Sequence, residues 1–209
     1  MRPENLILEA CVETLEEAKK AELCGANRIE LCGDLSVGGV TPSVELALAC
    51  LQVLKIPIMA MVRPRGGDFV YSDAAYLQMK QDIELFKKIG VAGVVFGILD
   101  KKSEVDIERT RELTELAKPL LVTFHKAIDD TPDPVESIEK LTQVLGIQRV
   151  LTSGGKVNAL DGSEVLRKMR AVAEGKITIL AAGKVTKENL MQVHSAVRTS
   201  EYHGKRIVF

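Results

Sequence analysis

Two copies of a Glu-x-Cys pattern place carboxylates and thiols at positions where they could act together. Glu9 and Cys11 form the first copy, and Glu30 and Cys32 repeat it 21 residues later. Residues two apart on a β-strand point the same way, so each Glu shares a face with its Cys. Carboxylates can move protons, and thiolates are soft ligands that suit Cu(I) or zinc. Cys11 and Cys32 are therefore the candidate metal ligands.

An arginine and a histidine end two further apolar segments. By the same alternation rule, Arg63 and His125 should point inward beside the two glutamates. Glu9, Glu30 and His125 are the candidate acid and base groups. The alternative is that Glu9, Glu30 and Arg63 form a structural ion pair at the end of a core.

An arginine-rich loop and the small residues that end the sixth, seventh and eighth strands, at 152–155, 181–184 and 203–205, predict anion binding. The loop reads Arg-Pro-Arg-Gly-Gly-Asp-Phe over residues 63–69, and guanidinium groups match carboxylate or phosphate oxygens. The strand ends could offer backbone N–H donors, although glycine also serves plain tight turns. The candidate anion-binding residues are Arg63, Arg65, Asp68, Ser153, Gly154, Gly155 and Gly183.

The elements that must position these residues repeat about eight times. Several apolar segments of strand length are nearly continuous, as in buried parallel sheets. They start 21 to 34 residues apart, at residues 6–12, 27–31, 58–63, 92–97, 120–125, 149–152, 177–181 and 201–203. Eight strands favour a (β/α)8 TIM barrel, and an open doubly wound sheet would normally show a glycine fingerprint after its first strand. We therefore expect one barrel domain over residues 1–209, with the chemistry at the carboxyl ends of the strands.

Helical patterns fill the spaces between the strands. They cover residues 14–24, 43–54, 73–88, 106–118, a segment opening at Asp133-Pro134, 162–172 and 186–197. Thr14 and Glu17 predict a capping box, and Cys24 and Cys50 should be core residues on apolar stripes. Because the sequence stops at Phe209, the barrel should lack a full last outer helix.

Composition excludes several classes of function. With 28 Lys and Arg against 29 Asp and Glu, the net charge of −1 argues against a nucleic-acid partner. No apolar stretch reaches the length of a membrane span, and the N-terminus lacks signal-peptide order. Four cysteines at these spacings form neither a disulfide framework nor a zinc finger. We expect a cytoplasmic protein with reduced thiols.

Several longer motifs resemble those of the CutC family, in the same order from Leu8 to Gly204. They lie at residues 28–32, 38–43, 63–69, 93–97, 124–127, 151–155 and 203–204. The resemblance implies a cytoplasmic (β/α)8 barrel, a homo-oligomer, and a role in copper homeostasis with Cu(I) on two cysteines that match Cys11 and Cys32. The turn at residues 180–184 is less rich in glycine than in the family. The missing last helix would leave one side of the barrel bare, where a partner subunit could cover it.

Two functions besides copper handling stay open. One is an enzyme that uses acid–base chemistry on a small anionic substrate, such as a phosphorylated one, held by Arg63 and Arg65. The other is a scaffold or interaction protein whose polar groups do no chemistry. The expected ligand is thus a copper ion or a small anionic molecule.

Overall fold

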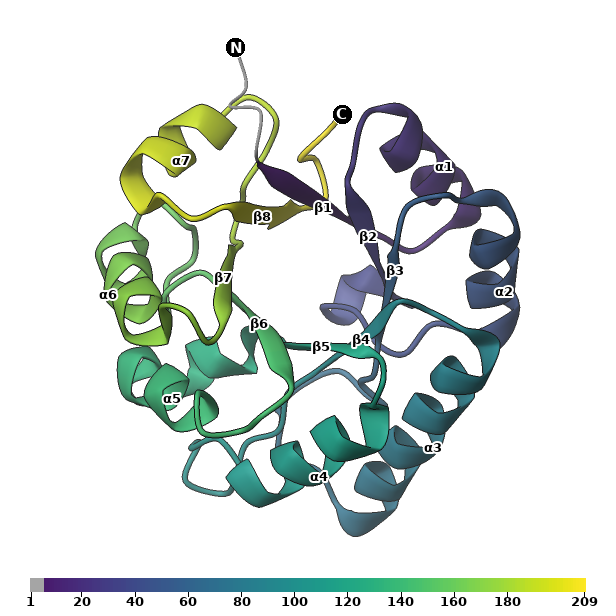
Figure 1. Cartoon of the computed structure of the whole chain (residues 1–209), viewed down its shortest axis with the longest axis horizontal. Coiled ribbons are helices and arrows are strands. Elements are labelled where there is room, and N and C mark those ends of the chain that lie inside the picture. The colour runs from purple at the N-terminus through teal and green to yellow at the C-terminus, as the bar shows by residue number, and fades with distance from the viewer. Residues whose placement is uncertain (1–5) are drawn as a thin grey trace.

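Eight parallel strands form a closed barrel in the computed structural model, which describes residues 6–209 (Figure 1). The strands follow chain order, and β8 pairs with β1 to close the barrel. Their bounds are β1 Ile7–Val12, β2 Arg28–Leu31, β3 Ile58–Met61, β4 Gly93–Phe96, β5 Leu121–Phe124, β6 Ile147–Thr152, β7 Thr178–Ala181 and β8 Glu201–Gly204. The predicted (β/α)8 class is confirmed.

Seven α-helices form a ring outside the barrel (Figure 1). They are α1 Leu15–Leu23, α2 Val44–Val53, α3 Asp73–Ile89, α4 Ile107–Ala117, α5 Pro134–Leu141, α6 Ser163–Ala173 and α7 Leu190–Val197. Two 3₁₀ turns, η1 Leu35–Val37 and η2 Lys126–Asp130, follow β2 and β5. Within residues 6–209, no helix combines the length and the apolar character that crossing a bilayer requires.

The helix ends differ from the predicted ones at two places. Thr14 caps α1 by accepting from the Glu17 N–H at 3.1 Å, but Glu17 reaches back to the Glu13 N–H instead of that of Thr14. Of the two hydrogen bonds of the predicted capping box, the one from the Glu17 N–H to Thr14 is present. The other runs from the Glu13 N–H, one residue earlier than predicted, to the Glu17 side chain. The last helix begins at Leu190 instead of residue 186, because the Asn189 side chain bonds the Thr186 N–H and ties residues 186–189 into a turn.

The predicted core position of Cys24 is wrong, whereas that of Cys50 is right. Cys24 is the C-cap of α1 and is exposed. The helix ends at Leu23, so Cys24 does not continue the buried face of the helix. Cys50 is fully buried between α2 and the barrel.

The missing last helix does not leave β8 bare. Tyr202 points outward from β8 and is fully buried, with its hydroxyl at 2.8 Å from His194 Nδ1 of α7. After β8 the chain turns back, and Ile207 and Val208 are buried in the main apolar core. Residues 207 and 208 therefore pack over this side of the barrel.

A candidate metal and ligand site at the barrel mouth

Strand register brings the two Glu-x-Cys copies together inside the barrel. Glu9 of β1 lies opposite Arg28 of β2 on one side and opposite His203 of β8 on the other. Cys11 lies opposite Glu30. Because these residues all point inward, neighbouring strands build one polar cluster at the carboxyl end of the barrel, which we call the mouth.

Glu9 is the ionised anchor of this cluster. Arg28 donates to its Oε2, and His203 Nδ1 lies 2.8 Å from its Oε1. Burial alone would raise the pKa of Glu9, but His203 and Arg28 lower it to about 2. Arg28 also pairs with Glu201, which accepts from Arg149 at 2.9 Å. The structural ion pair expected with Arg63 is therefore made with Arg28 instead.

The two cysteines and Glu30 meet directly above this anchor. One ligand atom from each of Cys11, Glu30 and Cys32 lies within 4.8 Å of the others, and the same holds for Glu9, Glu30 and His203. Cys32 Sγ is 3.5 Å from Glu30 Oε2, and His203 Nε2 is 3.7 Å from the same oxygen. All these groups are buried.

The two thiols have opposite protonation tendencies. A hydrogen bond from Cys32 holds the pKa of Cys11 well below its usual range against the effect of burial, and His203 adds to this. The same contact and burial raise the pKa of Cys32 well above its usual range. Cys11 therefore ionises more readily than Cys32, because the hydrogen bond between them favours the thiolate on Cys11.

The two remaining titratable groups are both protonated. Burial raises the pKa of Glu30 well above its usual range, so its carboxyl is neutral. Burial opposes the charge on His203, but Glu30, Cys11 and Glu9 outweigh it and raise its pKa well above the usual value. A thiolate and an imidazolium thus lie side by side at the mouth.

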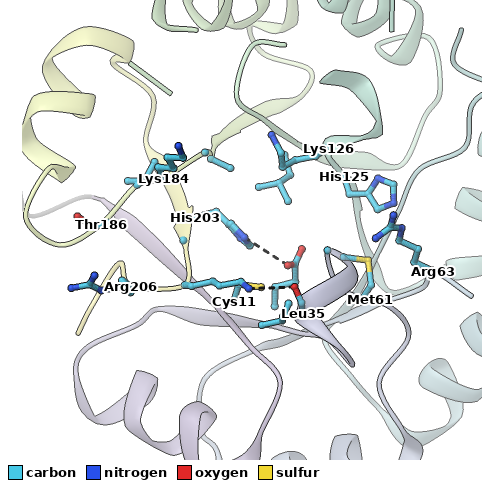
Figure 2. Close-up of a pocket in the computed structure, with 18 of the residues that line it drawn as sticks. Cys11, Leu35, Met61, Arg63, His125, Lys126, Lys184, Thr186, His203 and Arg206 are labelled. Atoms are coloured by element: carbon cyan, nitrogen blue, oxygen red, sulfur yellow. Dashed lines mark hydrogen bonds and ion pairs between the residues drawn. The ribbon is translucent and has the colours of Figure 1, made fainter. Parts of the chain in front are cut away.

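A cavity of about 460 Å³ opens over this cluster (Figure 2). In Figure 2, Cys11 and His203 lie across the cavity from Met61, Arg63 and His125. The cavity is lined by Cys11, Glu30, Leu35, Gly38, Met61, Arg63, Phe69, His125, Lys126, Leu151, Ala182, Gly183, Lys184, Val185, Thr186, His203, Gly204, Lys205 and Arg206. The structure therefore brings Cys11, Glu30, Arg63 and His125 to one cavity, while Glu9 lies beneath it.

Arg63 and His125 line the cavity but are held by the scaffold. Arg63 donates to the carbonyls of Val37, Gly39 and Gly67, and its Nε has no partner among the described residues. His125 Nδ1 accepts from the Ala127 N–H at 3.2 Å. Its Nε2 is buried and, within residues 6–209, unpartnered.

The environment of His125 keeps its ring neutral. Burial, with Arg63 and then Lys126 nearby, lowers its pKa to about 3. The ring packs on Gly97, where a Cβ would lie 2.5 Å from His125 Nδ1. Only glycine fits at that position without moving the ring.

Arg65 and Asp68 lie outside the cavity lining. Arg65 donates to the Asp68 carboxylate at 2.7 Å and to the carbonyls of Gly66, Asp68 and Val70. Both side chains are exposed. Arg65 and Asp68 thus bond to each other, and Arg65 also bonds to the backbone of the same loop. The structure therefore does not bring them to the other predicted site residues.

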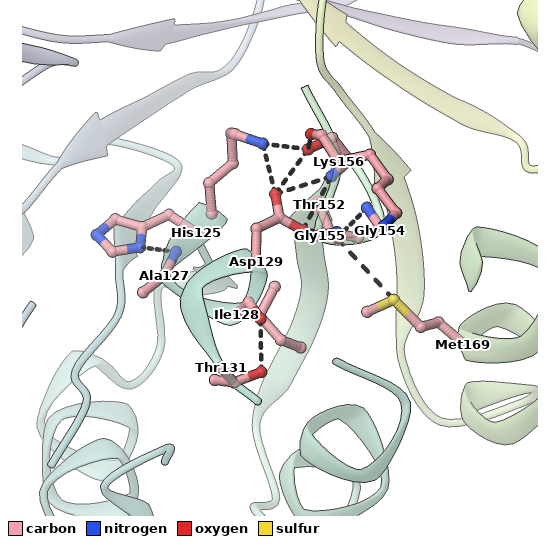
Figure 3. A network of polar contacts seen from close by, with 12 residues as sticks. His125, Ala127, Ile128, Asp129, Thr131, Thr152, Gly154, Gly155, Lys156 and Met169 are labelled. Carbon is pink, nitrogen blue, oxygen red and sulfur yellow. Dashed lines mark hydrogen bonds and ion pairs between the residues drawn. The ribbon is translucent and has the colours of Figure 1, made fainter. Parts of the chain in front are cut away.

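The loop after β6 already holds an anion, which is the side chain of Asp129 (Figure 3). Asp129 accepts from the Ser153 N–H at 2.9 Å and the Gly155 N–H at 2.8 Å. Lys126 pairs with the same carboxylate, and the Gly154 N–H donates to Thr152 Oγ1. An external anion at the Ser153 and Gly155 N–H groups would have to displace Asp129.

Gly183 differs from that group because it lines the cavity. Its φ is +95°, and a Cβ there would lie 2.7 Å from Ser153 Cβ. Glycine therefore lets the loop after β7 approach the loop after β6 closely.

His203 and Arg28 belong to the candidate site, but the sequence patterns did not single them out as site residues. His203 was seen only as part of a glycine-containing strand end, and Arg28 only as part of a family motif. The alternation rule could have found both, because Arg28 shares a face with Glu30 and His203 shares one with Glu201. The alternation rule could not have found Asp129, because this residue lies in a 3₁₀ turn and not in a strand.

Fold and site together define a class: a (β/α)8 barrel with a buried thiol, carboxyl and histidine cluster under an open cavity. The chain matches the CutC family over residues 6–208, and it belongs to that family. It is 42% identical over 197 residues to the human copper homeostasis protein cutC homolog, an alignment that covers 94% of this chain and 72% of the relative.

Solved structures agree with this assignment. A CutC crystal structure from Streptococcus agalactiae superposes with a TM-score of 0.91 at 31% identity, covering 97% of this chain and 99% of the other. Phosphoribosylanthranilate isomerase from Thermotoga maritima superposes with a TM-score of 0.61 at 13% identity, covering 95% and 86%. The second likeness shows the barrel fold alone. The chain is thus a copper homeostasis protein of the CutC family.

Proposed function

We propose that this chain performs its role in copper homeostasis by binding one Cu(I) ion between Cys11 and Cys32. The observation that carries the proposal is the grouping of both sulfur atoms and a Glu30 oxygen within 4.8 Å in a buried pocket. Thiolates are the ligands that Cu(I) favours, and Cys11 is already held as a thiolate. Binding would release the Cys32 proton, since a ligating thiol is deprotonated.

The site suits Cu(I) better than zinc. Structural zinc takes four ligands, usually cysteine and histidine. Here both ring nitrogens of His203 face carboxyl groups, Nδ1 toward Glu9 and Nε2 toward Glu30. As an imidazolium, His203 has no lone pair to offer a metal. Two sulfurs therefore remain as the ligand set.

The charge balance of the cluster favours an ion of single positive charge. The imidazolium of His203 would lie beside the metal, and Glu9 beneath it is already neutralised by Arg28. Two thiolates would then face one Cu(I) and one imidazolium, which balances. Because both sulfurs must be reduced, we place the protein in a reducing compartment such as the cytoplasm.

A competition titration with a chromophoric Cu(I) chelator under anaerobic conditions tests the proposal. Wild-type protein should take one Cu(I) per chain, and Cys11→Ser/Cys32→Ser should lose that binding. Cys24→Ser/Cys50→Ala, which removes the two cysteines outside the mouth, should still take one. Undiminished affinity in Cys11→Ser/Cys32→Ser would refute the proposal.

A further inference from the structure

A copper ion between the two cysteines leaves most of the mouth cavity unexplained. Cys32 is fully buried beneath the cavity, and Cys11 reaches its floor. The remaining space, about 460 Å³ in all, is within the range of pockets that bind small organic molecules. Its walls are apolar at Leu35, Met61 and Phe69. This volume and lining fit a molecule, whereas a bare ion needs neither.

Charge around the rim of the cavity is positive, whereas Cys11 and His203 form a pair of opposite charges on its floor. Its cationic lining residues are Arg63, Lys126, Lys184, Lys205 and Arg206. Glu30 is the single carboxyl group among the lining residues. The whole chain carries a net charge of only −1, so this concentration of positive charge is local. A cavity lined by one sign of charge attracts ligands of the other sign.

Three of these cations are free to meet a ligand. Lys126 pairs with Asp129, and Arg63 is held by backbone carbonyls. In contrast, the exposed side chains of Lys184 and Arg206 make no hydrogen bond or close ion pair with any of residues 6–209, although the Glu188 carboxylate lies near enough to Arg206 to feel its charge. Lys205 makes one long contact, at 3.5 Å, with the Leu35 carbonyl. We call Lys184, Lys205 and Arg206 the rim cations.

We propose that the mouth cavity binds a small organic anion, a carboxylate or a phosphate, whose charged group is held by the rim cations and whose other end reaches Cys11. The apolar walls would contact its carbon skeleton. This inference does not depend on copper, because the rim cations cannot ligate Cu(I) and the cysteines supply no positive charge.

Alkylation of Cys11 by two matched reagents tests this directly. Iodoacetate is itself a small carboxylate, and iodoacetamide is its neutral analogue. Both form the same kind of S–C bond with a thiolate and release iodide, so the ratio of their rates cancels differences in thiol exposure and pKa. Exposed Cys24 of the same chain supplies the reference ratio. We expect the iodoacetate-to-iodoacetamide ratio at Cys11 to exceed that at Cys24 by about tenfold or more.

Variants and competitors complete the experiment. Lys184→Gln/Lys205→Gln/Arg206→Gln should lower the ratio at Cys11 several-fold towards that at Cys24, with His203, Arg63 and Lys126 accounting for what remains. Lys55→Gln/Lys176→Gln, which removes two exposed lysines that precede β3 and β7 at the opposite end of the barrel, should leave the ratio unchanged. Succinate or glycerol 3-phosphate should protect Cys11, whereas succinamide should not, and the better protector identifies the anionic group.

Two results would overturn the inference. One is an equal reagent ratio at Cys11 and Cys24, and the other is a ratio at Cys11 that the rim variant does not change. Copper binding is read separately, since the rim variant should still take one Cu(I) per chain. Failure of the anion inference with intact copper uptake would therefore leave the proposed function standing.

Discussion

Glu9 and Glu30 occupy the same sequence context, yet the structure gives them opposite charge states. Glu9 has Arg28 and His203 as direct partners, which lower its pKa to about 2. Glu30 has no arginine partner, and burial keeps its carboxyl neutral. Because the Glu30 carboxyl is neutral, two sulfur ligands can bind the metal without a third negative charge beside them. Position relative to the neighbouring strand, and not residue type, decides the role of each glutamate.

Replacing Arg28 should destabilise the fold, because Glu9 would then be buried without its arginine partner. Arg28→Met leaves buried Glu9 without its arginine and half-buried Glu201 with Arg149 alone, and we expect a loss of about 3–5 kcal/mol in the free energy of unfolding in urea. Arg111→Met, on the exposed surface of α4, should change it little. Adding Glu9→Gln to Arg28→Met should restore part of the loss. Equal urea midpoints for Arg28→Met and Arg111→Met would count against the ion-pair account.

His125 should make the stability of the fold depend on pH. Its folded pKa of about 3 lies below the ordinary value of 6.5, so below pH 6.5 the unfolded chain binds a proton that the folded chain does not. Stability should therefore fall as the pH drops from 6.5 towards 3. Between pH 7 and pH 4.5 the wild type should lose about 2 kcal/mol more than His125→Asn in matched urea titrations. Parallel losses in the two proteins would show that His125 does not titrate in this way.

At the scale of elements, the loop after β6 and the turn after β5 form one unit. Asp129 of η2 accepts from Thr152 Oγ1 and from two backbone N–H groups of the β6 loop (Figure 3). Those N–H groups are the donors that the sequence suggested for an external anion. The Asp129 carboxylate already occupies the N–H donors on this side of the mouth. The rim cations therefore remain as the groups that are available to bind an anion.

Removing the charge of Asp129 should loosen this unit. Asp129→Asn keeps the shape but loses charge-assisted hydrogen bonds, so the free energy of unfolding should fall by about 1–3 kcal/mol. Amide hydrogen exchange at Ser153 and Gly155 should accelerate. Asp130→Asn, at the exposed neighbouring position, is the matched control. Unchanged exchange at both amides in Asp129→Asn would show that the carboxylate does not hold the loop.

The elements show what the sequence could and could not predict. Apolar runs fix the strands and their inward faces, so the meeting of Cys11, Glu30, Arg63 and His125 at one cavity could be foreseen. The partners within each strand pair could not, because they depend on register, which places Glu9 against Arg28 and His203. Loop side chains such as Arg65 bond their own backbone, and no periodicity reports that.

At the scale of the whole molecule, a short tail completes the barrel. Ile207 is 1% exposed and Val208 is 4% exposed, and both belong to the main core with the outward residues of β8. The chain therefore covers this side of the barrel itself. The predicted homo-oligomer stays a prediction.

Truncating the tail side chain should weaken closure of the barrel. Ile207→Ala should lower the free energy of unfolding by about 2–5 kcal/mol, since a buried side chain is lost and a cavity remains. Val157→Ala, at a side chain that is 72% exposed, should cost almost nothing. Thermal and urea unfolding measure both. A tail that contributes nothing would leave the two variants equally stable.

The metal ligands themselves can be counted by X-ray absorption at the copper K-edge. On Cu(I)-loaded wild-type protein, the account predicts two sulfur neighbours, and on Cys24→Ser the same two. Cys11→Ser or Cys32→Ser should reduce sulfur coordination or abolish loading. A copper shell made of nitrogen and oxygen alone, or one that Cys11→Ser leaves unchanged, would contradict the claim that Cys11 of β1 and Cys32, which follows β2, bind the metal.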